Sequence, residues 1–141
     1  MKIEQAKKSD FAKVFALWKR AELTNAGIKR ERVEYGLLIE RNPNLCLVVH
    51  EGNAIIGTVF GAFNGRRAWI YHLVVDPKYR GKGIGTKLVK HVEKNLQRAG
   101  VTKIILGVGI DNLSTVPFYE KCGYKVMHDA VLFAKDLYKV H

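Results

Sequence analysis

The N-terminal third of the chain carries apolar residues at helical spacing after one short strand pattern. The spacing i, i+3, i+4, i+7 marks one buried helix face at Phe11, Val14, Phe15 and Trp18. Ser9 or Asp10 stands where a helix cap is expected, and residues 27–42 form a second, more highly charged helical pattern that ends before Pro43. With a strand expected at residues 2–6, this part of the chain predicts one strand followed by two helices.

The middle of the chain alternates apolar runs with turn signals. The runs cover residues 44–50, 54–63 and 68–76. "EGN" separates the first two runs, and "NGRR", whose Asn-Gly pair favours a type I′ turn, separates the last two. Three strands joined by tight turns predict an antiparallel meander.

The C-terminal part returns to helical spacing and ends in short elements. A helix beginning near Gly83 is predicted to end at Gly100, with its apolar face at Leu88, Val89, Val92 and Leu96. The apolar run 103–108 is typical of a strand covered on both faces. Residues 114–123 predict a short helix, and residues 124–137 a final hairpin. The order of elements predicts an α/β fold, a mixed sheet with helices on both faces.

Composition places the chain among globular proteins. Its 141 residues are expected to form one domain, residues 1–141, and 48% hydrophobic with 26% charged residues argues against disorder. No apolar run approaches the roughly 18 residues that span a bilayer, and the N-terminus lacks an apolar signal core, so a cytoplasmic location is expected. Cys46 and Cys122 are far apart and form no CxxC pair, which favours free core thiols over a disulfide framework or a zinc site.

Positive charge is concentrated in one stretch. The net charge is +11, and between Asp76 and Lys103 eight Lys or Arg residues stand against only Asp76 and Glu93. Such a surplus favours a phosphate-rich ligand at this place. Charge alone does not distinguish a cofactor from nucleic acid.

The sequence "YRGKGIGTKL" (79–88) places alternate glycines at a strand-to-helix junction. Successive backbone N–H groups of such a segment can converge on one anion, and the positive end of a helix adds to the attraction. Arg80 and Lys82 add charge at the rim. The P-loop pattern GxxxxGK[ST] is not met, and the dinucleotide pattern GxGxxG fails because Thr86 takes its last position. The alternative is a flexible turn leading into a surface helix.

These residues carry a resemblance. "LVVDPKYRGKGIGTKLV" resembles the cofactor-binding segment of the GNAT acetyltransferase superfamily, whose pattern Arg/Gln-x-x-Gly-x-Gly/Ala is filled by Arg80, Gly83 and Gly85. The segment "LGVGIDNLSTVPFYEKCGY" and the order of elements also fit, so the resemblance covers essentially the whole chain. It implies a mostly antiparallel twisted sheet of six to seven strands. It also implies an N-acetyltransferase without a metal, in which a primary amine attacks acetyl-CoA directly in a ternary complex.

The resemblance further implies how coenzyme A binds. Main-chain N–H groups would hold the pyrophosphate at Gly81, Lys82, Gly83, Ile84, Gly85 and Thr86, with Arg80 beside them. The main chain of Leu73, Val74 and Val75 would pair with the pantetheine arm, and an amide near Val75 would stabilise the oxyanion. Lys87 and Lys90 are candidates for the 3′-phosphate, with a solvated helix face as the alternative.

Two further residues match functional positions of the family. Tyr119 stands where a tyrosine donates a proton to the coenzyme A sulfur, and a phenol with a pKa near 10 is protonated at neutral pH. Its alternative is aromatic packing on a short helix. Asn112 matches a position that contacts the pantetheine arm. Its alternative is a cap for the helix 113–121, a role that Asp111 or Ser114 could also fill.

The general base is left unassigned. In the branch that acetylates protein N-termini a glutamate stands at the position of Gly107, and other branches have Glu or His at the positions of Trp69 and Tyr71. Trp69 and Tyr71 are therefore expected to line the acceptor pocket and to favour an apolar or aromatic group. Strand alternation is expected to send His72 to the opposite face as a core residue. The alternatives are ordered water, bulk solvent, or one of three side chains: Glu34, His50 and Glu51.

Two other function classes stay open. The missing base keeps a catalytically silent acyl-CoA sensor as an alternative, and the basic charge keeps a nucleic-acid-binding module. Against the latter, the sequence has no RNP-like segment and no recognition-helix pattern. The identity of the acceptor is not specified by any residue, and the resemblance allows a homodimer without naming its interface.

Overall fold

A computed structural model describes residues 1–137 of the chain. The chain divides into two compact units, residues 1–107 and the residues from Val108 onward. No helix of the described part is both long and apolar enough to cross a membrane. The expectation of one domain over residues 1–141 stays a prediction.

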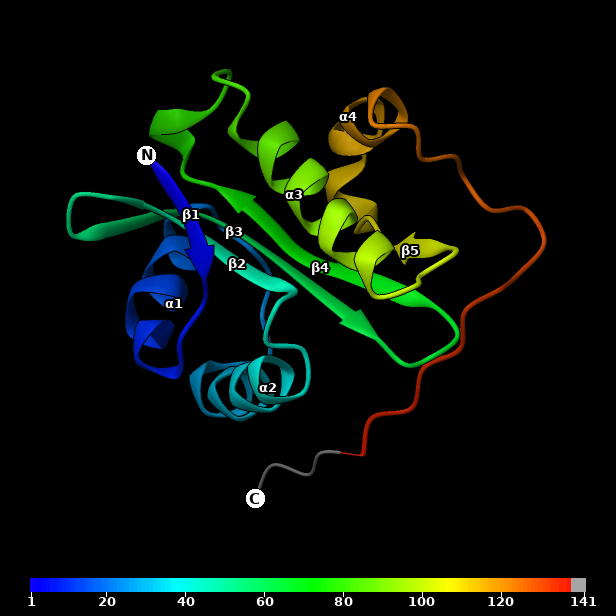
Figure 1. Ribbon diagram of the computed structural model, residues 1–141, viewed down its shortest axis with the longest axis horizontal. Coiled ribbons are helices and arrows are strands. Elements are labelled where there is room, and N and C mark those ends of the chain that lie inside the picture. Colours follow the sequence, from blue (N-terminus) through cyan, green and yellow to red (C-terminus); the bar gives the residue numbers. More distant parts are fainter. Residues whose placement is uncertain (138–141) are drawn as a thin grey trace. The chain divides into compact units, whose positions relative to one another are not determined.

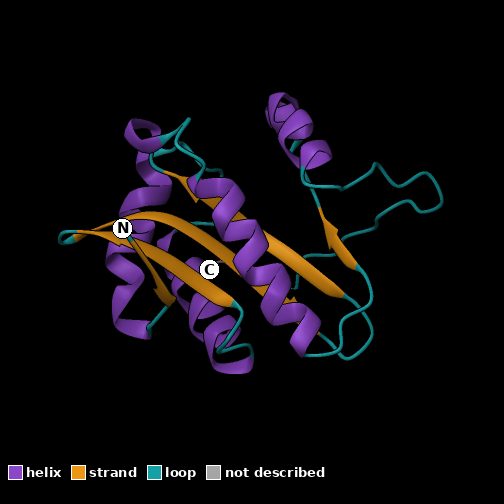
Figure 2. Cartoon of the chain, turned by 45° about the horizontal axis from the view of Figure 1, so that its top comes forward, coloured by secondary structure: helices purple, strands orange, loops and turns teal. Residues whose placement is uncertain are grey.

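The first unit is a five-stranded sheet with helices on both faces (Figures 1 and 2). Its strands are β1 (Lys2–Gln5), β2 (Cys46–Glu51), β3 (Ala54–Phe63), β4 (Ala68–Val75) and β5 (Ile104–Leu106). Its α-helices are α1 (Phe11–Arg20), α2 (Ile28–Arg41) and α3 (Ile84–Arg98). The strands lie in sequence order, antiparallel except for the parallel pair β4–β5. The predicted α/β class, meander and two-sided covering are confirmed.

Two glycines of β3 let α3 lie close to the sheet. A Cβ atom on Gly57 would be 3.2 Å from Leu88 Cδ1, and one on Gly61 would be 3.1 Å from Val92 Cγ2. At such distances a Cβ would require the Leu88 and Val92 side chains to shift by a few tenths of an ångström, and glycine avoids that shift. Gly57 pairs with Val75 across the ladder, so this close approach places the N-terminal turn of α3 beside the end of β4.

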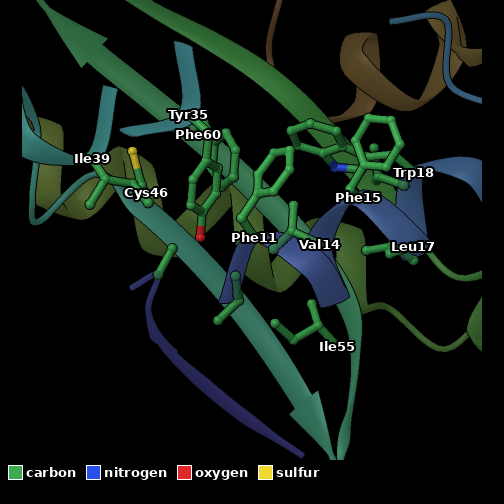
Figure 3. Close-up of a cluster of buried hydrophobic side chains, with 13 residues drawn as sticks. Phe11, Val14, Phe15, Leu17, Trp18, Tyr35, Ile39, Cys46, Ile55 and Phe60 are labelled. Atoms are coloured by element: carbon green, nitrogen blue, oxygen red, sulfur yellow. The ribbon is translucent and has the colours of Figure 1, made fainter. Parts of the chain in front are cut away.

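An aromatic cluster fills the space between the other face of the sheet and helices α1 and α2 (Figure 3). Within this cluster Trp18 makes edge-on contacts to Phe15 and Phe60, at 6.4 and 5.8 Å between ring centroids. Burial raises the pKa of the Cys46 thiol in this cluster to about 12, so that thiol is inert at neutral pH, as expected of a free core cysteine.

A β-bulge interrupts β4 beside this cluster. Thr58 pairs with Val74 and Phe60 with Tyr71, so His72 and Leu73 together face the single residue between them on β3. His72 has φ +50°, in the left-handed region that few non-glycine residues adopt. Phe60 pairs with Tyr71 across the ladder and its ring lies 5.9 Å from the His72 ring, so the bulge brings His72 to the same face as Tyr71. The expectation that alternation sends His72 to the opposite face is therefore wrong.

Thr58 fixes this bulge through one hydroxyl group. The buried Trp18 Nε1–H donates to Thr58 Oγ1 at 3.2 Å, and the Thr58 hydroxyl donates to the carbonyl oxygen of His72 at 2.8 Å. Thr58 itself is fully buried. The indole, the hydroxyl and the bulge carbonyl thus form one satisfied polar chain inside an apolar core.

We expect Thr58→Val to destabilise the fold by about 1–3 kcal/mol, because an isosteric methyl leaves buried polar groups unpaired. Thr58→Ser keeps the hydroxyl and is the matched control, with a smaller loss from the missing methyl. Urea unfolding followed by circular dichroism measures both. Equal destabilisation by Val and Ser would show that the hydrogen bonds add nothing to stability.

The second unit contains a 3-10 helix, Ile110–Thr115, and α4 (Val116–Lys121). The Tyr119 ring packs against Phe118 and Tyr124, with centroids 5.2 and 6.3 Å away. This part of the chain confirms the short helix predicted over residues 114–123.

The final hairpin predicted over residues 124–137 is not formed: those residues contain no strand. The sheet has five strands in the described chain, not six to seven. Apolar side chains of this segment, such as Val131 and Phe133, are 81% and 94% exposed. An alternating pattern predicts a strand only where another strand supplies a ladder and a covered face, and this segment pairs with none. β5 also differs from its prediction, since its three residues are only partly buried.

Candidate functional site

The C-terminal half of β4 has one free edge in the first unit. Parallel pairing with β5 joins Ala68, Trp69 and Ile70 to Ile104, Ile105 and Leu106, and then stops. Beyond Ile70, β4 continues to Val75 with β3 on its other side. No strand of the described sheet pairs with residues 71–75 on this edge. Backbone N–H and C=O groups need partners, so the edge can accept an extended ligand as an added strand.

The turn after β4 is held by Asp76, which is only 6% exposed. Its carboxylate accepts the Lys78 N–H at 3.0 Å and pairs with Arg20 Nε at 3.0 Å. Burial alone would raise the pKa of Asp76, but these two partners outweigh it and hold the pKa below the usual 3.8. Asp76 is therefore ionised at neutral pH and anchors the turn. Arg80 Nε donates to the Val75 carbonyl at 3.1 Å and ties the following loop back to the strand.

The glycine loop, residues 80–86, runs from this turn into α3. Gly81 and Gly83 have φ of +78° and +80°, and a Cβ on either would meet no atom within 4 Å. Glycine is therefore required here by backbone conformation rather than by space. Gly85 already lies inside α3, in its first turn.

Gly83 is the N-cap of α3, and the first bond within the helix runs from Lys87 N–H to Gly83 O at 3.1 Å. The N–H groups of Ile84, Gly85 and Thr86 therefore have no partner inside the helix. They point out of the positive end of the helix dipole, as in an anion site. Lys82 is exposed beside them, so the loop has the geometry and charge of a phosphate-binding turn. Lys87 and Lys90 are both exposed on α3.

A cavity of about 330 Å³ opens on the α1 and α2 side of β4. Its walls are mainly aromatic, and α2 adds two carboxylates; the lining residues include Trp18, Glu31, Glu34, Phe60, Tyr71 and His72. We call it the aromatic pocket. Trp69 is not part of its lining but stacks on Tyr71 at 6.3 Å. A larger cavity of about 640 Å³ contains none of residues 71–86, so it lies apart from the glycine loop.

The predicted alternatives for a base have different surroundings. Glu34 lines the aromatic pocket and pairs with Arg30 at 2.7 Å. His50 lies 3.5 Å from Glu4, and Glu51 lies 3.6 Å from the N-terminal amine. Gly107 is exposed and offers no side chain. Of these candidate bases, Glu34 is among the residues that line the aromatic pocket. The lining also includes His72, which regular strand alternation would place on the opposite face of the sheet.

In the second unit, Tyr119 is partly buried and burial raises the pKa of its phenol above 10, so it is protonated at neutral pH. Asn112 is exposed, and its backbone N–H donates to Gly109 O at 2.8 Å. Neither helix of this unit has a side-chain cap in the described structure. The capping alternative for Asn112, Asp111 or Ser114 is therefore wrong. Within the described chain, no group of three or more His, Cys, Asp or Glu side chains is placed to hold a metal.

Comparison with known proteins gives one consistent relationship. The sequence model of the acetyltransferase (GNAT) family matches residues 11–124. The acetyltransferase plu1384 of Photorhabdus laumondii is 36% identical over 138 residues, which cover 97% of this chain and 96% of that protein. The match extends from the first strand to the C-terminal segment, so it includes both units.

Solved structures agree in fold. The aminoglycoside antibiotic 6′-N-acetyltransferase AAC(6′)-IG from Acinetobacter haemolyticus has a TM-score of 0.79 at 18% identity, over 97% of this chain and 99% of that chain. A structure from Clostridium acetobutylicum, described as a predicted acetyltransferase with acetyl-CoA, has a TM-score of 0.73 at 20% identity. The match covers 94% of this chain and 95% of that chain. At these identities the similarity concerns the fold.

Proposed function

The chain belongs to the acetyltransferase (GNAT) family, and we propose that it is an N-acetyltransferase that uses acetyl-CoA. In this proposal a primary amine attacks the acetyl group directly while both substrates are bound. One observation carries it: the free edge of β4 and the glycine loop adjoin each other in one continuous stretch, residues 71–86. The extended pantetheine arm and the pyrophosphate, which are adjoining parts of coenzyme A, match these two surfaces.

The roles follow from the chemistry of each surface. The pyrophosphate binds the N–H groups of the glycine loop, with Arg80 and Lys82 neutralising its charge. The pantetheine arm pairs with the main chain of Leu73–Val75. The acetyl carbonyl then lies against a strand amide near Val75, which stabilises the oxyanion of the tetrahedral intermediate. Asn112 contacts the arm and Tyr119 protonates the departing sulfur.

The acceptor side of the proposal rests on the aromatic pocket. Tyr71 lines it and Trp69 stacks on Tyr71, so an acceptor with an apolar or aromatic group fits its walls. The sensor alternative shares the coenzyme A surfaces and differs only in the absence of turnover. The nucleic-acid alternative uses only the charge around the glycine loop. The cytoplasmic location and the homodimer stay predictions.

We expect Gly83→Val to weaken binding of acetyl-CoA about 5- to 100-fold. A β-branched residue at φ +80° costs about 1–3 kcal/mol of backbone strain, and relief of that strain displaces the N–H groups. Calorimetric titration of the purified protein with acetyl-CoA and with coenzyme A, each at two salt concentrations, measures this.

Gly65→Val is the matched control for that substitution. Gly65 also has a positive φ, +95°, and open space around its Cβ, but it lies in the turn between β3 and β4. Its replacement should leave the affinity unchanged. Absence of acetyl-CoA binding to the unaltered protein at both salt concentrations would refute the transferase and the sensor together, and salt-sensitive retention of nucleic acid would then be measured.

A further inference from the structure

We propose that His72 is the general base of this transfer, and that the aromatic pocket takes a primary amine bearing a flat apolar group. This inference rests on the proposed function and adds to it the residue that removes the proton. Regular alternation would turn His72 away from the pocket, so this role depends on the bulge in β4.

The bulge holds the His72 ring in one place. The imidazole stacks on Trp18 with centroids 4.3 Å apart and planes 18° from parallel, and it lies 5.9 Å from Phe60. Its carbonyl is fixed by the Thr58 hydroxyl. A non-glycine residue at φ +50° carries strain that persists only where the surroundings enforce it, and such strain is concentrated at functional sites.

The position along the strand is the second step. His72 directly precedes Leu73–Val75, the residues whose main chain receives the pantetheine arm in the proposed function. A ring on the pocket wall at His72 therefore lies between an amine in the pocket and the acetyl group at the strand edge. The acceptor enters from the α1 and α2 side, and coenzyme A from the free edge of β4.

The third step is an unused nitrogen. Among the described residues, His72 Nδ1 is the one buried side-chain nitrogen or oxygen without a hydrogen-bond partner. A histidine kept only for packing would be expected to satisfy its buried nitrogen, because an unpaired one costs free energy. Burial lowers the pKa of His72 below 6.5 and outweighs the opposing effect of Glu31 and Glu34. The ring is therefore neutral at neutral pH, so one of its two nitrogens carries a lone pair.

The pocket groups facing the ring define the acceptor. Glu31 and Glu34 present carboxylates from α2, which attract an ammonium group; Glu31 also accepts the Ala26 N–H at 3.0 Å, and Glu34 pairs with Arg30. Tyr35 and Tyr71 line the same pocket, and burial raises the pKa of both phenols, so both stay neutral. Aromatic faces bind both a cation and a flat apolar group. The acceptor is thus an arylalkylamine in chemical class.

The proton balance is simple. His72 takes one proton from the ammonium group, giving a neutral amine and an imidazolium. The amine lone pair forms the C–N bond, and the carbonyl electrons move to the oxygen. When the C=O bond re-forms, the C–S bond breaks and the thiolate takes a proton from Tyr119, which regains one from the substrate nitrogen. The imidazolium releases its proton to solvent by way of the pocket carboxylates, Glu31 and Glu34.

The test compares two amines of similar shape, benzylamine and aniline, with acetyl-CoA and a thiol-release assay at neutral pH. Benzylamine is protonated under these conditions and needs a base, whereas aniline is neutral. We expect His72→Phe, which keeps the stacked ring, to lower kcat/KM for benzylamine about 100-fold or more. The loss for aniline should be much smaller. His50→Phe, at a surface ion pair, is the matched control and should change neither.

The outcomes separate the two proposals. No binding of acetyl-CoA to the unaltered protein refutes the proposed function and this inference with it. Binding without turnover of either amine refutes the inference alone, and so does equal loss on both amines in a His72→Phe protein that binds acetyl-CoA normally.

If His72→Phe does not fold, a second measurement decides. In Trp69→Phe, Trp18 is the remaining tryptophan, and its fluorescence reports the charge of the stacked imidazole. The acid limb of kcat/KM for benzylamine in the same variant should coincide with that titration, with a midpoint below 6.5. If the acid limb of kcat/KM and the fluorescence titration had different midpoints, the assignment of His72 as the base would be wrong.

Discussion

Replacing Trp18 with alanine should lower the free energy of unfolding by about 3–5 kcal/mol, the range for a large aromatic side chain removed from a packed core. Trp18 is 1% exposed and contacts Phe15, Phe60 and His72. Its loss also removes the N–H donor to Thr58. Since a domain of this size is stable by about 5–15 kcal/mol, the variant should unfold at a markedly lower urea concentration.

Trp69→Ala is the natural control, because the chain has only two tryptophans. Trp69 is partly buried and stacks on Tyr71, so its removal should cost about 1 kcal/mol. Unfolding in urea, followed by circular dichroism, compares the two. Equal destabilisation would mean that the cluster around Trp18 is no more important to stability than the contact of Trp69 with Tyr71.

The elements predicted best from the sequence are those whose pattern has a single physical cause. Helix α3 shows an apolar face at 3.6-residue spacing and a glycine at each end, and it was predicted nearly to its bounds. The apolar runs predict the strands of the meander correctly because Asn-Gly and Gly-Asn turns separate them. Local sequence determines such features, since the residues that cause them lie within the element itself.

Features that depend on distant partners were not predicted. Alternation along "YHLVV" gives no sign of the bulge, because the extra residue is fixed by Thr58 and Trp18 from other elements. The segment 124–137 has the alternating apolar pattern of strands and lacks a partner strand in the described structure. Register and pairing are long-range properties, so a period of two is necessary for a strand and not sufficient.

The candidate site also has one part that local sequence predicts and another that depends on distant elements. The glycine loop could be predicted because its glycines, basic residues and helix start are contiguous, and the positive φ values of Gly81 and Gly83 agree with that prediction. The aromatic pocket could not, since its lining comes from α1, α2, β3 and β4. His72 was missed for this reason: only the bulge turns it toward Glu34. A histidine beside the pantetheine-pairing residues was the available signal.

Replacing Tyr119 with phenylalanine should lower kcat about 100-fold, the lower end of the usual range for loss of a general acid, with little change in acetyl-CoA affinity. The hydroxyl is the only group removed, and the ring keeps its contacts with Phe118 and Tyr124. Tyr124→Phe, in the same unit, is the matched control and should retain kcat. A catalytically silent sensor would instead show no turnover in either the unaltered protein or the variant.

The pH dependence of kcat is a second test of Tyr119 as the proton donor. Burial raises the pKa of Tyr119 above 10, so the phenol keeps its proton across neutral pH and loses it only in more alkaline solution. A proton donor of this kind makes kcat fall as the pH rises through that pKa, and Tyr119→Phe should abolish this alkaline limb.

An acetyl donor with a better leaving group, such as a nitrothiophenyl thioester, needs less protonation at sulfur. The variant should therefore lose less activity with that donor, and an equal loss with both donors would exclude Tyr119 as the acid.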